Sequence, residues 1–129
     1  MQADMPFELR GRLIALGADK HAKGIALPER ATSDADWIAG SYLVADDHAV
    51  HADYWERHPA GDEALYLVEG RLAITLAREG GSEMQTTLAA GEAFIVPQGI
   101  WHRLRVLEPG RLLVITPPKG TEHRRHEPR

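Results

Sequence analysis

Apolar and polar residues alternate in short runs along most of the chain, and glycine or proline residues separate the runs. Alternation with a period of two places successive side chains on opposite faces of a strand, so each run predicts a β-strand. We expect strands over residues 41–45, 48–58, 63–69, 71–77, 83–88, 93–96, 102–107 and 111–116. Many short strands with glycine turns between them predict an all-β jelly-roll barrel.

Some of the predicted strands are apolar on more than one face. Leu72, Ile74 and Leu76 share one face of their strand, and residues 112–115 are apolar throughout. One face of such a strand meets the barrel interior, so the other must meet further strands or a second subunit. This pattern, together with the resemblance described below, predicts a homodimer.

The two ends of the chain have a weaker pattern than residues 31–116, which we assign to the barrel domain. Residues 1–30 fit a leader of edge strands, although Gly11 and Gly17 weaken this assignment. Residues 117–129 carry no apolar side chain besides prolines, which predicts a disordered tail. We therefore interpret His123 and His126 as solvated tail residues rather than as a metal-binding pair.

Length, charge and composition limit the possible function. At 129 residues the chain is long enough for one domain, and its net charge of −4 argues against non-specific binding to nucleic acid. It has no cysteine, which excludes disulfides, thiolate ligands and a thiol nucleophile. No apolar run reaches the roughly 20 residues that a membrane span needs, and the first apolar run is too short for a signal peptide. We expect a cytoplasmic protein without membrane or nucleic-acid partners.

Candidate chemistry begins in the segment from Tyr54 to Gly70. Tyr54, Glu56 and His58 alternate and so share one face of a strand. Residues 59–61 read as a turn, and Glu63 opens the next strand. Two carboxylates and an imidazole that converge across a hairpin are suitable ligands for a divalent metal ion.

A second segment downstream completes the candidate site. Residues 94–96 form a short apolar strand, Pro97 to Gly99 predict a turn, and His102 begins another strand. His102 can therefore supply a further imidazole near the end of its strand. We expect the walls of the pocket to be apolar and to include Tyr54, Leu65, Leu67, Leu104 and either Phe94 or Ile95.

With both segments considered, the chain resembles the small single-domain cupins. The first cupin motif, which contains His-x-His, Glu and Gly at fixed spacings, is matched by His58, Glu63 and Gly70. The second, which contains Gly, Pro-x-Gly and His, is matched by Gly91, Pro97, Gly99 and His102. The chain departs from the motifs at Val50 and Val106, which stand where Gly and Asn are expected. A third departure is chemical, because Glu56 occupies the position of the first metal-binding histidine.

The resemblance implies a double-stranded β-helix and a metal centre with His58, Glu63 and His102 as ligands. Glu56 is then a fourth ligand or a catalytic base, and Tyr54 is a candidate acid, base or hydrogen-bond donor. The expected cofactor is one divalent ion of Fe, Mn, Zn or Ni. Its expected role is in an oxygenase, isomerase or lyase type of reaction on a small organic molecule. The alternatives are a metal-free barrel that binds or senses a small molecule, and a purely structural or partner-binding domain.

Overall fold

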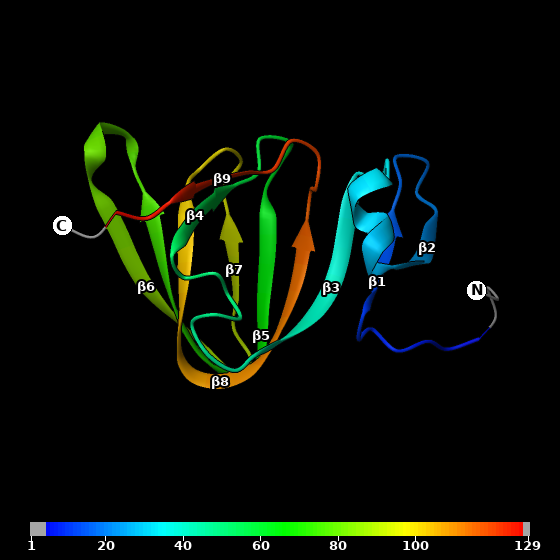
Figure 1. The fold of residues 1–129 in the computed structure, drawn as a ribbon, viewed down its shortest axis with the longest axis horizontal. Helices are drawn as coiled ribbons and strands as arrows, with labels where there is room; N and C mark the ends of the chain where they lie inside the picture. Colours follow the sequence, from blue (N-terminus) through cyan, green and yellow to red (C-terminus); the bar gives the residue numbers. More distant parts are fainter. Residues whose placement is uncertain (1–4, 128–129) are drawn as a thin grey trace.

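The computed structural model describes residues 5–127, and its strands pair in antiparallel fashion (Figure 1). Within these residues the chain forms β1 (Arg12–Leu16), β2 (Ala22–Ala26), η1 (Leu27–Thr32), β3 (Trp37–Val44), β4 (Tyr54–Arg57), β5 (Glu63–Ala77), η2 (Glu79–Gly81), β6 (Glu83–Ala89), β7 (Ala93–Val96), β8 (His102–Thr116) and β9 (Glu122–Arg125). The all-β jelly-roll prediction is confirmed. None of the helices in the described residues is long and apolar enough to cross a membrane.

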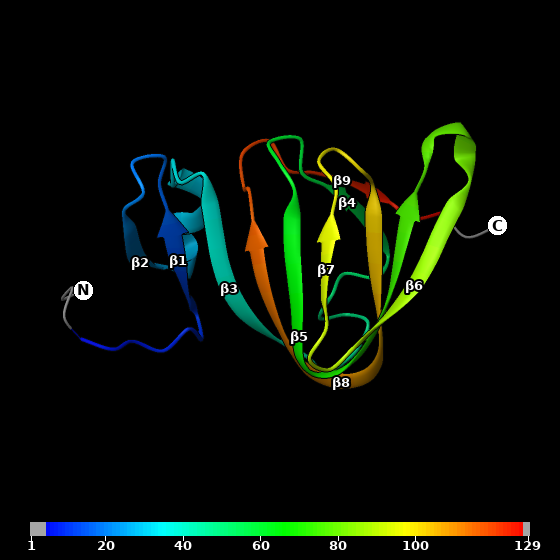
Figure 2. The ribbon, with the colours of Figure 1, turned by 180° about the vertical axis from the view of Figure 1, so that it is seen from behind.

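Two strands of 15 residues, β5 and β8, form the frame of the barrel (Figures 1 and 2). The first part of β5 pairs with β7 and with the end of β8, whereas its second part pairs with β6 and with the start of β8. Each long strand therefore takes part in both halves of the barrel. We predicted two short strands in place of each long one, since a glycine lies at the middle of each.

Those central glycines are needed because β5 and β8 bend and approach closely at the same place. Gly70 has a φ of +98°, and a Cβ atom there would lie 2.7 Å from the carbonyl oxygen of Glu108. A Cβ atom on Gly110 would overlap the backbone of Glu69. The register between β5 and β8 shifts here, so the strands turn a corner without ending.

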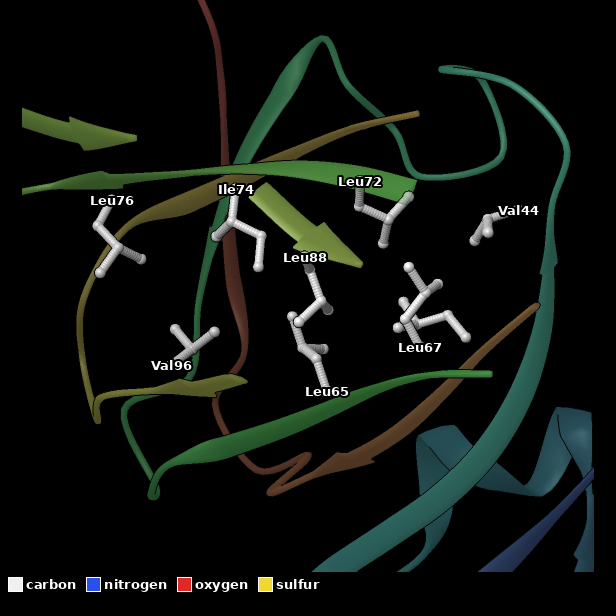
Figure 3. Packing of buried hydrophobic residues seen from close by; sticks show 9 residues of the cluster. Val44, Leu65, Leu67, Leu72, Ile74, Leu76, Leu88 and Val96 are labelled. Carbon is white, nitrogen blue, oxygen red and sulfur yellow. The ribbon is translucent and has the colours of Figure 1, made fainter. Parts of the chain in front are cut away.

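The barrel core consists of aliphatic side chains that point into the space enclosed by the strands (Figure 3). Alternate residues of β5 supply most of it, as the sequence pattern predicted. Its buried members are Val44, Leu65, Leu67, Leu72, Ile74, Leu76, Leu88, Val96 and Leu112. A second, smaller cluster of Leu13, Ala15, Ile25, Ala35 and Ile38 lies beneath η1 and the leader strands.

The leader extends the barrel sheet at one end in the order β2–β1–β3 (Figures 1 and 2). Leu13 pairs with Ile25 of β2, and both are buried. Strands over part of residues 1–30 are thus present, and η1 follows them at Leu27–Thr32. This arrangement carries Arg30 of η1 to the edge of the barrel interior.

The prediction of a disordered tail is wrong for residues 117–127. Residues Glu122–Arg125 form β9, which pairs with β4 over four residues. All four β9 side chains are exposed, so the strand adds little to the core. It is held by the backbone ladder and by opposite charges that face each other, as in the pair Arg57 and Glu122 at 3.0 Å. Residues 128–129 lie outside the described part of the chain.

The predicted strand over residues 48–58 is also wrong in its first half. The strand begins at Tyr54, and turns occupy the residues before it. Asp46 accepts a hydrogen bond from the Ala49 amide, and Asp47 accepts one from the Val106 amide at 2.8 Å. These hydrogen bonds favour turns rather than an extended strand before Tyr54. The alternating sequence pattern gave no sign of them.

Candidate metal centre

Two tight turns, one before β5 and one before β8, bring the predicted ligands together. The Gly99 amide donates to the His58 carbonyl oxygen at 3.1 Å, and the Gln98 amide donates to Asp62 Oδ1 at 2.7 Å. The side chain of Gln98 adds a bond to the Pro59 carbonyl oxygen at 2.7 Å. His58 therefore enters the site from one turn, and His102 enters from the strand that follows the other.

Glu56, His58, Glu63 and His102 converge so that one ligand atom of each lies within 4.8 Å of the others. His58 Nε2 lies 2.9 Å from Glu56 Oε1 and 3.0 Å from Glu63 Oε2. His102 Nε2 lies 3.1 Å from Glu63 Oε1. Ligand atoms at about 2.1 Å from a common ion would be about 3.0 Å apart at right angles, so these spacings suit a divalent ion.

The tautomer of His58 is set by a hydrogen-bonded threonine that the sequence did not point to. Thr121 Oγ1 donates its hydrogen to the Pro118 carbonyl oxygen at 3.1 Å. The same oxygen lies 2.9 Å from His58 Nδ1, so it must accept a hydrogen from that nitrogen. With Nδ1 protonated, Nε2 is the nitrogen that faces the carboxylates and is available to a metal ion.

His102 is oriented in the same way. Its Nδ1 lies 3.2 Å from the carbonyl oxygen of Ile100, which can only accept. The Nε2 atom of His102 therefore also points toward Glu63. Both imidazoles are almost fully buried, at 2% exposure for His58 and 4% for His102.

His58 Nε2 is a buried polar atom with an unusual environment. Although it lies beside two carboxylate oxygens, it makes no hydrogen bond of acceptable angle with any described residue. A nitrogen aimed between two carboxylates, rather than at either, suits an ion that all three contact. The donor set therefore fits a divalent metal.

The two carboxylates differ in their surroundings. Glu63 is buried and accepts a hydrogen bond from Thr116 Oγ1 at 2.7 Å, in addition to its contacts with the imidazoles. Glu56 has a side chain that is 33% exposed, and its Oε2 lies 2.6 Å from His123 Nε2 of β9. A residue interpreted as a solvated tail histidine is thus a direct neighbour of the site, while His126 lies apart beside Trp55.

Mutual electrostatics shift the pKa values of three groups in the cluster. Burial lowers the pKa of His58, but the carboxylates of Glu56 and Glu63 outweigh it and raise the pKa to about 9. Burial raises the pKa of Glu63, but His102 and His58 outweigh it and lower the pKa to about 2. For Glu56, the effect of burial is likewise outweighed by His58, so its pKa is lowered. Without a metal, the centre therefore holds an imidazolium between two carboxylates.

A cavity of about 400 Å³ opens beside the cluster. Glu56, Glu63 and His102 form its polar end. Its remaining lining includes the apolar Val44, Val50, Leu65, Leu104, Leu112 and Val114, and the polar Arg30, Tyr42, His51, Tyr54, Arg103, Thr116 and His123. A concave space that combines apolar walls with convergent polar groups is typical of a small-molecule site.

The predicted pocket walls are correct in part. Tyr54, Leu65 and Leu104 line the cavity, with Tyr54 at its partly exposed rim. Leu67 and Phe94 instead pack in or against the barrel core, and Ile95 lies on the outer face. The predictions for these three residues failed because alternation along a strand does not tell how far along the barrel a side chain lies.

Comparison with solved structures shows the same fold in larger proteins. An S161A mutant of Bacillus subtilis oxalate decarboxylase OxdC is 18% identical with a TM-score of 0.54, over 70% of this chain and 24% of that one. Hydroxypropylphosphonic acid epoxidase from S. wedmorenis, in complex with fosfomycin, is 18% identical with a TM-score of 0.51, over 63% of this chain and 43% of that one. The present chain thus spans less than half of either protein.

A cupin-2 domain containing protein from Shewanella frigidimarina is 26% identical over 64% of this chain and 71% of that one, with a TM-score of 0.49. No curated protein matches the chain. The sequence model of the cupin domain family matches residues 43–116, which is more than half of the chain and includes all four residues of the cluster. The chain therefore belongs to the cupin domain family.

Proposed function

We propose that this protein binds one divalent metal ion through Glu56, His58, Glu63 and His102. The observation that carries the proposal is the orientation of the two buried imidazoles. Each is held at Nδ1 by an acceptor oxygen, so His58 presents Nε2 to both carboxylates and His102 presents Nε2 to Glu63. Partners at the far nitrogen of a histidine are the usual way in which proteins orient metal ligands.

The charge of the cluster favours particular ions. The two carboxylates neutralise a divalent cation once His58 has lost its proton. Oxygen-rich ligand sets favour harder ions, so Mn(II) and Fe(II) are preferred over Zn(II) and Ni(II) in this proposal. The bound ion would supply Lewis acidity or oxygen activation toward a small organic molecule in the cavity.

Several residues of the chain would serve such a reaction. Glu56 is the less buried carboxylate and lines the cavity, so it is the ligand that could leave the ion and act as the base. Tyr54 lies at the cavity rim with a phenol that can donate a hydrogen bond. The apolar walls would exclude water from the ligand and strengthen these polar contacts. We therefore propose a metal-dependent enzyme of oxygenase, isomerase or lyase type.

Elemental analysis tests the metal site directly. The protein is purified without metal and refilled separately with Mn(II), Fe(II), Zn(II) and Ni(II), as wild type and as His102→Ala. His21→Ala, in an exposed histidine outside the cluster, is the matched control. We expect about one ion per chain in wild type and control, and a large loss in His102→Ala. Equal, near-zero metal content in all three proteins would refute the proposal. If the wild type does bind metal, oxygen uptake by its Fe(II) form separates an oxygenase from the other reaction types.

A second candidate function is a metal-free barrel that binds a small molecule. The observation that favours it is the ion pairing of the cluster by itself, since an imidazolium at His58 lies against both carboxylates and offsets one of their two negative charges. In that case a chelator leaves ligand binding and thermal stability unchanged. Under the leading proposal, removal of the metal lowers the melting temperature.

We also propose that the protein forms a homodimer through the outer face of the sheet. Cross-strand partners place Ile14, Ala39, Ile115, Ala64 and Ile95 in one row across β1, β3, β8, β5 and β7. Tyr66 and Val68 lie beside this row and are more than 40% exposed. A contiguous apolar face of this kind is typical of a subunit interface. Light scattering at micromolar concentration tests it, with Ile95→Glu expected to yield monomers, and a monomeric wild type would refute it.

A further inference from the structure

We infer that the cavity beside the metal centre is built for a small organic carboxylate, whose anionic group is held by Arg30 and Tyr42. This inference rests on the proposed function only for the orientation of the ligand, whose other end would face the metal cluster. Its evidence is separate from the metal ligands. It comes from one arginine and one tyrosine that line the cavity, and from one glycine beneath the tyrosine ring.

Arg30 is a cation without an anionic partner. It lies on η1 and lines the cavity, yet it makes no ion pair or side-chain hydrogen bond with any residue among 5–127. The other arginine that lines the cavity, Arg103, is tied down at one end of its guanidinium. Its Nη1 donates to the Ala52 carbonyl oxygen at 3.3 Å, and the group lies 5.5 Å from the ring of Trp55, although its buried Nε has no hydrogen-bond partner among the described residues. Arg30 is therefore the more freely placed guanidinium for an incoming anion.

Tyr42 is directed toward the same place by the glycine two residues before it. A Cβ atom on Gly40 would lie 2.9 Å from both Cε2 and Oη of Tyr42, so the ring lies back over Gly40. Gly40 pairs with Val114, two residues before Thr116, which donates to Glu63. The phenol thus lies level with Val114, which is roughly 7 Å along β8 from Thr116, the partner of Glu63.

Partial burial and the nearby carboxylates of Glu63 and Glu56 keep this phenol as a hydrogen-bond donor. Burial raises the pKa of Tyr42, and the positive charge of Arg30 opposes but does not cancel that effect. The phenol is therefore protonated at neutral pH. A guanidinium and an O–H group that line the same cavity provide the donors that a carboxylate accepts, and a planar guanidinium can bind both of its oxygens.

The cavity between the two ends selects the rest of the ligand. The cavity also has apolar walls, which include Val44, Leu112 and Val114. A volume of about 400 Å³ suits a molecule of the size of a substituted aromatic or branched aliphatic acid. The anionic cluster of Glu56 and Glu63 would repel the carboxylate if it entered the metal-free site the other way round.

The test compares benzoate and phenylacetate with benzamide and phenylacetamide, which have nearly the same shape without the charge. Binding is measured by protein NMR titration on metal-free and on metal-filled protein. The variants are Arg30→Gln, Arg30→Lys and Tyr42→Phe. Arg12→Gln is the matched control, since Arg12 is exposed on the neighbouring β1 and does not line the cavity.

We expect the acids to bind more tightly than the amides and to shift the Arg30 Nε–Hε signal. Arg30→Gln should weaken acid binding by about tenfold, with partial recovery in Arg30→Lys and a smaller loss in Tyr42→Phe. Amide binding and the Arg12→Gln variant should show no such change. The inference is overturned if no acid binds to either form of the protein, or if Arg30→Gln changes acid binding by less than about twofold. Metal content is measured on the same samples, so a failure of the metal proposal is recognised separately.

Discussion

Metal binding should release close to one proton from His58 at neutral pH. In the metal-free protein the pKa of His58 is raised from 6.5 to about 9, because the carboxylates of Glu56 and Glu63 outweigh the opposite effect of burial. A metal ion needs the neutral imidazole, so it must displace the Nε2 proton. When no metal is bound, the positive charge that this proton gives the imidazole lies beside both carboxylates.

The size of the effect follows from the two pKa values. At about pH 7.5 a group with a pKa of about 9 is ~97% protonated, whereas an ordinary histidine is ~9% protonated. The proton should therefore reduce the apparent metal affinity about 30-fold at this pH, which corresponds to about 2 kcal/mol. Below pH 9 the affinity should rise about tenfold for each pH unit.

Calorimetric titration in buffers with different ionisation enthalpies measures the number of protons released. Glu56→Gln removes one of the two carboxylates that raise the pKa of His58, so it should release fewer protons at the same pH. Glu69→Gln changes an exposed carboxylate outside the cluster and serves as the control. If wild-type protein binds metal at about pH 7.5 with a release close to zero, the electrostatic argument for His58 is refuted.

Three further predictions concern the groups around the cluster. Thr121→Val removes the acceptor at His58 Nδ1 and should lower metal affinity by roughly 10- to 100-fold in chelator competition, whereas the exposed Thr87→Val should not; an unchanged affinity would show that the contact does not orient the ring. Thr116→Val removes the donor to buried Glu63 and should lower the metal-free unfolding free energy in urea by about 2 kcal/mol, and a loss below about 0.5 kcal/mol would contradict the role given to this bond. The metal-free protein should be most stable between pH 4.5 and 6.5, because the contribution of Glu63 is lost as pH falls toward about 2 and that of His58 as pH rises through about 9. A melting temperature that fails to drop below pH 4.5, or that fails to drop above pH 6.5, would contradict this.

The residues that approach each other in the cluster could be predicted from sequence because local rules govern them. Glu56 and His58 share a face by strand alternation, and Glu63 returns after a turn whose glycine and proline mark it. His102 lies far along the chain and was placed by the cupin resemblance, since no local rule pairs β4 with β8. The structure gives that pairing as Glu56 opposite His102.

The neighbours of the cluster could not be predicted, because their positions depend on which strand edge is free. The tail lacks apolar residues and can bury little apolar surface, so its composition predicts disorder. Yet β4 offers an unpaired edge, and the tail presents Glu122 opposite Arg57 and the imidazole of His123 beside Glu56. Complementary charge across a free edge was the signal that could have identified β9.

The continuity of the long strands β5 and β8 also could not be predicted from the local sequence. Gly70 was interpreted as the end of a strand, since glycine weakens strand interiors. In the structure it lies within β5, at the point where the backbone of β8 approaches too closely for a side chain. Whether a glycine ends a strand or bends it depends on the segment that crosses it, and that segment is more than 30 residues away along the chain.

The departure from the cupin motif at Glu56 and the unexpected strand β9 belong together. A histidine at position 56 would present one nitrogen to the cluster, whereas a carboxylate has two oxygens to satisfy. Oε1 of Glu56 faces His58 at 2.9 Å, and Oε2 faces His123 at 2.6 Å. The carboxylate therefore links the cluster to β9. Thr121, the hydrogen-bond partner of His58 Nδ1, directly precedes this strand. Two of the four cluster residues are thus positioned by the C-terminal segment, so a change of ligand type at one position is accompanied by a strand that supports it.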